Sequence, residues 1–182
     1  MNNESLSALR ADFDATAQRS LSMPLAGALV WTALAIASFL VPARSQVFVV
    51  LYGTGVVFPV ALAIGAIRKE NILARDNPLN RLMGQAVLMV NLLWVLHIPL
   101  AIWKPEFVVL SLGVGLGIHW IVFGWIINHP LGLIHAIMRS VLAVTAWVLF
   151  PEHRIVAVAA TVVLSYLVSL IQLMQRPLNK AD

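Results

Sequence analysis

Six long apolar segments follow one another along the chain and constrain its fold more than any other feature. They cover residues 24–41, 47–67, 82–102, 107–127, 131–150 and 155–174. A helix needs about 20 apolar residues to cross a hydrocarbon core roughly 30 Å thick. The segments meet that length and do not alternate with period two, as the strands of a membrane barrel would. The sequence therefore predicts an all-α polytopic membrane bundle with six transmembrane helices.

Composition agrees with a membrane protein. Hydrophobic residues make up 60% of the chain and charged residues 11%, whereas soluble domains average about 45–50% and about 25%. The chain has no cysteine, which excludes disulfides, thiolate catalysis, zinc–cysteine sites and iron–sulfur clusters. We interpret the net charge of +4 as a topology signal and expect no nucleic-acid partner.

The chain divides into a cytoplasmic N-terminal segment (1–22), a single six-helix transmembrane domain (23–175) and a cytoplasmic C-terminal tail (176–182). The first segment is polar and does not have the basic start and apolar run of a signal peptide. Leu6, Leu9, Phe13 and Ala17 form a weak helical stripe there. This stripe predicts a short helix lying at the membrane interface, and a loosely ordered tail is the alternative.

Positive charge predicts the orientation of the bundle. Three basic residues fall on one side of the predicted membrane: Arg44, Lys104 and Arg154. Eight fall on the other: Arg10, Arg19, Arg68, Lys69, Arg75, Arg81, Arg176 and Lys180. Because cytoplasmic loops of multi-pass proteins are enriched in Lys and Arg, we expect both termini in the cytoplasm and the bundle in the cell (inner) membrane.

A Pro-Leu pair recurs at positions 24, 78 and 130, where each outward-running helix would begin. The pattern predicts three helical hairpins of about 50 residues each and an internal repeat. Convergence is the alternative, because proline is well tolerated in the first turn of any helix. Pro59 and Pro99 lie inside predicted spans, where we expect them to kink the helices.

Arg139 carries the strongest functional signal. It is the ninth residue of the apolar segment 131–150, near the membrane midplane. A charged residue at that depth costs about 2.5–3.5 kcal/mol on insertion scales and usually faces the bundle interior or a water-filled cavity. It would serve either as an anion or headgroup site or as a structural residue bonded to carbonyls and amide side chains.

Three further polar residues could join Arg139 in one site. His135 lies four residues earlier, on the same helix face, and His119 and Asn91 lie near the midplane of other spans. No predicted span contains Asp or Glu. The counter-charge of Arg139 would therefore come from a ligand, from a lipid, or from Glu106 or Glu152 reaching inward. We predict a ligand-binding site of Arg139, His135, His119 and Asn91.

We expect neither a cofactor nor a metal ion. The histidines at 119, 129 and 135 do not have the i, i+4 spacing of a helical metal motif. His97 and His153 could meet Glu106 and Glu152 near the outer turns, which would make only a weak metal site. The sequence contains no nucleophile elbow and no paired carboxylates. Whether the chain is an enzyme stays open, and these absences speak against it.

Gly113, Gly117 and Gly124 form a ridge of small residues in the fourth segment. Such ridges let membrane helices approach closely, either within one chain or between protomers of a homo-oligomer. The stretch from Gly113 to Gly117 does not follow a strand, so we reject a nucleotide-binding loop.

In layout and size the chain resembles small uncharacterised bacterial six-helix membrane proteins. The resemblance implies no functional residues, because it includes no motif. We expect a small transporter, channel or binding protein for an anionic or polar solute or lipid. A structural or partner-binding membrane subunit is the first alternative, and an intramembrane lipid-modifying enzyme is the second.

Overall fold

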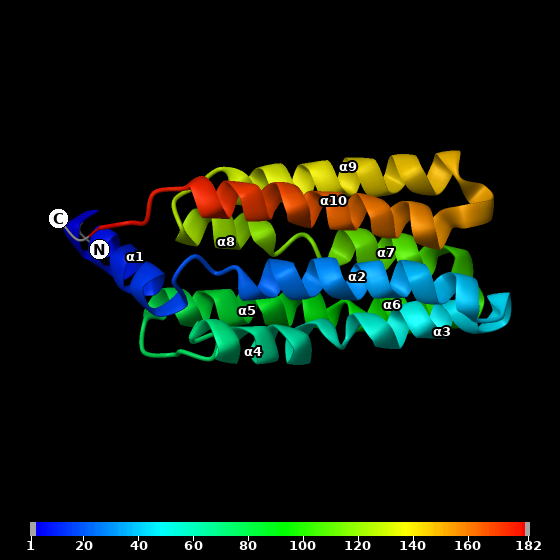
Figure 1. Ribbon diagram of the computed structural model, residues 1–182, viewed down its shortest axis with the longest axis horizontal. Coiled ribbons are helices and arrows are strands. Elements are labelled where there is room, and N and C mark those ends of the chain that lie inside the picture. The colour runs from blue at the N-terminus through cyan, green and yellow to red at the C-terminus, as the bar shows by residue number, and fades with distance from the viewer. Residues whose placement is uncertain (1–2, 181–182) are drawn as a thin grey trace.

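The computed structural model describes residues 3–180, with side chains from residue 6 on, and all regular structure in that range is helical. A helix α1 (Asn3–Ala17) lies obliquely at one end of a long bundle (Figure 1). The bundle consists of α2 (Ser22–Leu40), α3 (Ala43–Thr54), α4 (Val57–Arg68), α5 (Pro78–Leu92), α6 (Trp94–Trp103), α7 (Val108–Gly115), α8 (Trp120–Ile126), α9 (Leu131–Leu149) and α10 (Arg154–Gln175), with short 3-10 turns at η1 (Pro105–Phe107) and η2 (Pro151–His153).

Five helical segments within the described residues are long and apolar enough to cross a membrane. They are Ser22–Leu40, Pro78–Trp103, Pro105–Ile126, Leu131–Leu149 and Pro151–Gln175. The pair α3–α4 makes a sixth if its two halves, bent by 41°, form one span. The predicted all-helical fold with long apolar helices is confirmed, and the count of six depends on this bent pair.

The bend between α3 and α4 has a local cause. Pro59 lies in the first turn of α4 and has no amide hydrogen to donate to the carbonyl of Gly55, where the helix is interrupted. Its ring also crowds that carbonyl. The predicted kink at Pro59 is therefore present. Pro99 lies inside α6, whereas the break of that span falls earlier, at Leu93.

The interior of the bundle is built around α10, which packs against both α2 and α9. Its inward residues Val158, Val162 and Leu173 are fully buried and belong to one apolar cluster with Trp31 of α2 and Leu112 of α7. The outer surface is apolar as well. Leu29, Ile36, Leu88, Val95, Val144 and Ile171 are among its exposed side chains. Apolar surface of this extent suits contact with lipid chains.

The helix α1 packs onto the end of the bundle, where Phe13 and Asp14 are buried. Asp14 forms a buried ion pair with Arg176 and accepts hydrogen bonds from the backbone and side-chain amides of Asn179. Arg10 donates to the last carbonyls of α8, and Arg19 donates to those of α10. These bonds satisfy carbonyls that helix ends leave free. The predicted short N-terminal helix is thus present, and part of it is buried against the rest of the protein.

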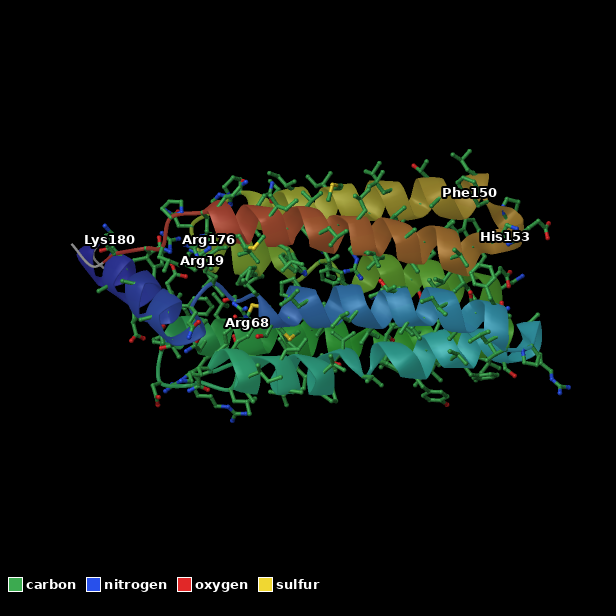
Figure 2. All side chains as sticks on the ribbon, in the orientation of Figure 1. Arg19, Arg68, Phe150, His153, Arg176 and Lys180 are labelled. Atoms are coloured by element: carbon green, nitrogen blue, oxygen red, sulfur yellow. The ribbon has the colours of Figure 1, made fainter. Side chains whose placement is uncertain are left out.

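Figure 2 shows how basic residues divide between the two ends of the bundle. Arg19, Arg68, Arg176 and Lys180 lie at the end that carries α1, which we call the α1 end, and His153 lies at the opposite end. The two ends of the described chain also lie at the α1 end (Figure 1). Arg44 and Arg154 line one cavity together with His153. These two arginines are therefore separated along the bundle axis from the basic residues labelled at the α1 end.

Candidate functional site

Arg139 lies in the middle of α9 and is fully buried. Small residues make room for it. Ala136 and Ala143 are buried residues near it on the same helix, and Gly117 faces it from the neighbouring span. A Cβ atom on Gly117 would lie 2.7 Å from the Arg139 Cδ. The absence of a side chain at Gly117 therefore provides space that the arginine side chain occupies.

A break between α7 and α8 supplies the hydrogen-bond acceptor for Arg139. The amide of Gly117 bonds the Val114 carbonyl rather than that of Gly113, which frees the Gly113 oxygen. The Arg139 Nε–H donates to this oxygen. The span predicted at residues 107–127 is present as one segment of membrane length, Pro105–Ile126, but turns at residues 116–119 interrupt its helix. Low helix propensity of the closely spaced glycines, together with the arginine bond, accounts for the break.

Two aromatic rings complete the surroundings of the guanidinium. Its Cζ lies 5.1 Å from the ring centroid of Tyr166 on α10 and 5.8 Å from that of Trp31 on α2. Rings at this distance attract a cation through their quadrupole, more strongly where water is absent. Gly27 leaves the space for the Tyr166 ring, since a Cβ there would lie 2.4 Å from Tyr166 Cζ.

The outer nitrogens of the guanidinium are unsatisfied. Arg139 Nη1 and Nη2 are buried and have no hydrogen-bond partner, and the same holds for Trp31 Nε1. All three atoms are donors only. None of the described membrane-length segments contains an Asp or Glu apart from Glu106 and Glu152, which are exposed in the turns η1 and η2. A buried donor without an acceptor lowers the stability of the folded state. An anion or another acceptor bound here would satisfy these three donors.

His135 lies one turn before Arg139 on α9, and His119 lies two residues after Gly117, which faces Arg139. The His135 ring stacks on Trp120 with a centroid distance of 3.9 Å, and its Nδ1 lies 2.8 Å from Ser169 Oγ. Its Nε2 is buried without a partner. His119 ends the break between α7 and α8, and its Nδ1 is also unsatisfied. We call Arg139, His135, His119, Trp31 and Tyr166 the arginine cluster.

Asn91 is not brought into the arginine cluster. It lies on an exposed face of α5, and its side-chain amide donates to the Val87 carbonyl of its own helix. An amide that bonds its own backbone is satisfied without any partner from another helix. The structure therefore gives no contact between Asn91 and the other three predicted site residues.

Sequence reasoning missed Trp31 and Tyr166. Both are aromatic residues in the middle of apolar spans, whereas aromatic anchors gather near the ends of spans. This position was the available signal. Gly27, one turn before Trp31, was a second signal, because a glycine within a helix often marks the close approach of a large side chain.

The three glycines of the predicted ridge have their close contacts within the chain. Gly113 faces Val158 of α10, Gly117 faces Arg139, and Gly124 lies against the backbone of Gly132. Of the two alternatives for this ridge, packing within the chain is the one that the structure shows. A homo-oligomer would need a different surface.

A cavity of about 690 Å³, which we call the lateral cavity, lies between α1, α4, α5 and α8. Its lining includes Phe13, Phe58, Glu70, Arg75, Asn80, Arg81, Met83, Gly84, Gln85, Val87, Leu88, His119 and Trp120. His119 and Trp120 thus separate this cavity from the rest of the arginine cluster.

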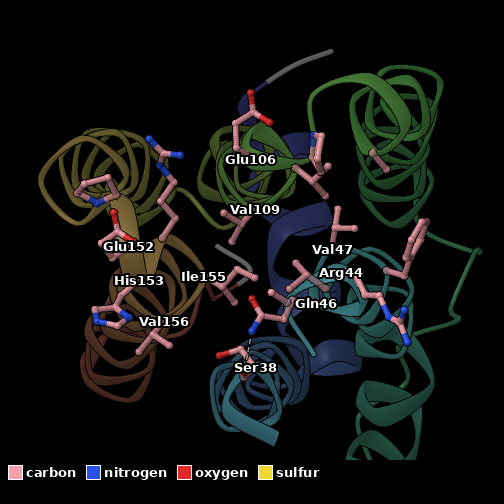
Figure 3. A pocket seen from close by; sticks show the side chains of 18 of the residues that line it. Ser38, Arg44, Gln46, Val47, Glu106, Val109, Glu152, His153, Ile155 and Val156 are labelled. Atoms are coloured by element: carbon pink, nitrogen blue, oxygen red, sulfur yellow. Dashed lines mark hydrogen bonds between the residues drawn. The ribbon is translucent and has the colours of Figure 1, made fainter. Parts of the chain in front are cut away.

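A second cavity, of about 480 Å³, lies at the opposite end of the bundle, and we call it the end cavity. Figure 3 shows Arg44, Glu106, Glu152 and His153 around it, with Gln46 bonded to the Ser38 carbonyl. Val109 also lines it. Along the α7–α8 span the end cavity reaches Val109 and the lateral cavity reaches His119. Arg139 contacts the residues between them.

No group of three or more metal-ligating side chains occurs among the described residues. His97 lies apart from the acidic residues of the end cavity, and its Nδ1 is 3.0 Å from Ser111 Oγ.

The fold and the site define a class: an all-helical bundle with spans of membrane length around a buried arginine. Within that class, the chain belongs to DUF7010, a family of unknown function whose model matches residues 6–176. No curated protein and no solved structure matched the chain.

Proposed function

We propose that this protein is a six-span integral membrane protein that binds an anionic or polar solute, or a lipid headgroup, at Arg139. The observation that carries the proposal is the set of buried, unpartnered donors at Arg139 Nη1, Arg139 Nη2 and Trp31 Nε1. A bound acceptor would satisfy them and supply the missing negative charge. Membrane proteins often use intramembrane ionisable residues in this way.

We extend the proposal to transport or conduction of the bound solute, and the arrangement of the two cavities supports this extension. The two cavities approach the arginine cluster from opposite ends of the bundle. The layer between them contains Arg139, the helix break and the stacked pair His135–Trp120. A charged layer between two cavities would select an anionic solute, and movement of His119 or Trp120 would open it to the lateral cavity.

The proposed orientation places the α1 end in the cytoplasm of the cell membrane. Eight of the eleven basic residues outside Arg139 belong to that side of the chain, in agreement with the positive-inside rule. In this orientation α3 and α4 form one bent span, both termini are cytoplasmic, and the end cavity faces the outside.

Thermal unfolding of the purified protein with added anions tests the proposed site. A ligand that binds only the folded state raises its stability by RT ln(1 + [L]/Kd). We expect phosphate or sulfate to raise the unfolding temperature of the wild type, and Arg139→Gln to abolish the rise. The control is Arg154→Gln, because Arg154 contacts the Trp147 ring near the opposite end of α9. An equal rise in the Arg139→Gln variant would contradict the proposal and favour a structural subunit.

A further inference from the structure

The lateral cavity opens onto the surface of the bundle. It is bounded by α4 and α5, which make few contacts with each other, since α4 packs on α2 and α5 packs on α8 and α1. Phe58 of α4 and Gly84 and Leu88 of α5 line the cavity and are exposed. The opening therefore lies on the face that the lipid chains of a bilayer would contact.

The depth of the cavity matches one leaflet. Its lining on α5 runs from Asn80 to Leu88, which is about 12 Å at the helical rise of about 1.5 Å per residue. Half of a hydrocarbon core of about 30 Å is about 15 Å. An acyl chain in the leaflet on the α1 side could thus lie alongside the cavity over most of the thickness of that leaflet.

The lining changes from polar to apolar along this length. At the α1 end it includes the exposed side chains of Arg75 and Arg81, which form no ion pair among the described residues. Toward the middle its apolar side chains include Met83, Val87 and Leu88, and its polar ones are Gln85 and His119. An anionic headgroup would fit the first region and an acyl chain the second.

The one acidic residue of the lining does not compete with an anionic ligand. The Glu70 carboxylate pairs with Arg68 and accepts hydrogen bonds from the backbone amides of Leu21 and Ser22. It is buried, whereas Arg75 and Arg81 are exposed. The positive charge of the two arginines is therefore available at the mouth of the cavity.

Gln85 gives a second indication of a ligand. It lines the cavity two turns into α5, is exposed, and its side chain has no hydrogen bond within the described part of the chain. An unpaired amide at the level of lipid chains is costly. The ester oxygens of a glycerophospholipid are acceptors that would satisfy it.

We infer that the lateral cavity binds one anionic phospholipid from the leaflet on the α1 side. Its phosphate lies against Arg75 and Arg81, its glycerol esters lie near Gln85, and one acyl chain lies between Phe58 and Leu88. The inference does not depend on the proposed Arg139 site, because none of these residues belongs to the arginine cluster.

Native mass spectrometry with added lipid tests this site. The probes are dioleoyl phosphatidylglycerol and dioleoyl phosphatidylcholine, each titrated into the detergent-purified protein. We expect the wild type to bind one phosphatidylglycerol more tightly than phosphatidylcholine. The Arg75→Gln/Arg81→Gln variant should lose this preference, with phosphatidylglycerol binding weaker by about fivefold per arginine.

A second variant fills the cavity without disturbing the fold. A Cβ atom on Gly84 meets nothing within 4 Å, so Gly84→Phe can enter the cavity and should block both lipids. The matched control is Ala66→Phe on α4, an exposed position that does not line the cavity. Unchanged binding in Gly84→Phe would overturn the inference. Loss of phosphatidylglycerol in Arg139→Gln, with retention in Gly84→Phe, would assign the lipid to the arginine cluster instead.

Discussion

Arg139 and Gly113 lie on different spans, and the Arg139 Nε–H donates to the Gly113 carbonyl oxygen. This bond holds the guanidinium by one of its five N–H groups. The terminal Nη1 and Nη2 groups stay free of partners, although they are buried. A residue retained only to hold helices together would be expected to use more of its donors. The arrangement therefore combines a fixed position with unused bonding capacity.

The unsatisfied charge predicts an unusual stability for Arg139→Met. Replacing buried charges by apolar residues of similar size is often neutral or stabilising by about 1–4 kcal/mol. We expect the ligand-free variant to unfold at a temperature equal to or above that of the wild type, measured by differential scanning fluorimetry in detergent. Added anions should then stabilise the wild type alone. A large loss of stability in the ligand-free variant would show that Arg139 is structural.

Replacing glycine by alanine should have opposite effects on stability at Gly132 and at Gly84. Gly132→Ala places a Cβ 2.0 Å from the Trp120 carbonyl oxygen and 2.6 Å from the Gly124 nitrogen. Backbone atoms cannot move aside as a flexible side chain can, so α8 and α9 must separate. Overpacking of this kind costs about 1–3 kcal/mol or more.

Gly84→Ala is the matched variant, because its new methyl group meets nothing within 4 Å. Alanine in a helix interior is favoured over glycine by about 0.8–1 kcal/mol. We expect a higher unfolding temperature for Gly84→Ala and a lower one for Gly132→Ala, measured by circular dichroism. Similar shifts for both variants would contradict the close approach of α8 and α9.

The ion pair between Asp14 and Arg176 predicts how α1 is attached. Both side chains are almost fully buried, and removing one partner of a buried pair costs about 3–5 kcal/mol. Asp14→Asn should therefore detach α1 and expose it to protease, measured by limited proteolysis of the purified protein.

Asp76→Asn is the control for this cleavage, since Asp76 is exposed in the loop between α4 and α5. The double variant Asp14→Leu/Arg176→Met should regain part of the resistance, because it leaves no unpaired charge. Equal resistance of Asp14→Asn and the wild type would show that other bonds hold α1.

The features of this fold that the sequence predicts are those that depend on residues close together in the chain. The apolar segments predict the helices, and the positions of Pro78 and Pro130 predict where α5 and α9 begin. The buried face of α9 also follows from its sequence, because His135 and Arg139 are one turn apart. The helices, their starting points and the buried face of α9 can each be read from a short stretch of sequence.

Features that depend on distant residues were not predicted. The pairing of Asp14 with Arg176 joins positions 162 residues apart. The position of Tyr166 beside Arg139 was not predicted either. The sequence patterns of α9 and α10 do not show which faces of the two helices meet. The break at residues 116–119 depends on both nearby and distant residues. Its glycines are visible in the sequence, but its cause includes an arginine from another helix. Asn91 was predicted to belong to the site only because it lies near the membrane midplane. Depth in the membrane does not determine toward which neighbouring helix a side chain points.

Glu70 predicts a pH dependence at the α1 end. Burial would raise the pKa of its carboxyl group, but the hydrogen bonds from Arg68 and from the backbone amides of Ser22 and Leu21 favour the charged form, and the net effect lowers the pKa below 4.5. Because the pKa in the folded state is depressed, the stabilisation is present above pH 4.5 and is lost as the pH falls through the folded-state value. The loop that Glu70 joins to the start of α2 should therefore loosen in acid.

Comparison of Glu70→Gln with the wild type measures this contribution. We expect the wild type to be more resistant to proteolysis of the loop between α4 and α5 at neutral pH, with the difference shrinking as the pH falls below 4.5, the ordinary pKa of a glutamate. Glu152→Gln at the opposite end is the control, because that side chain is exposed and should leave the pH profile unchanged. A difference between Glu70→Gln and the wild type that is constant with pH would mean that Glu70 acts through the shape of its side chain rather than its charge.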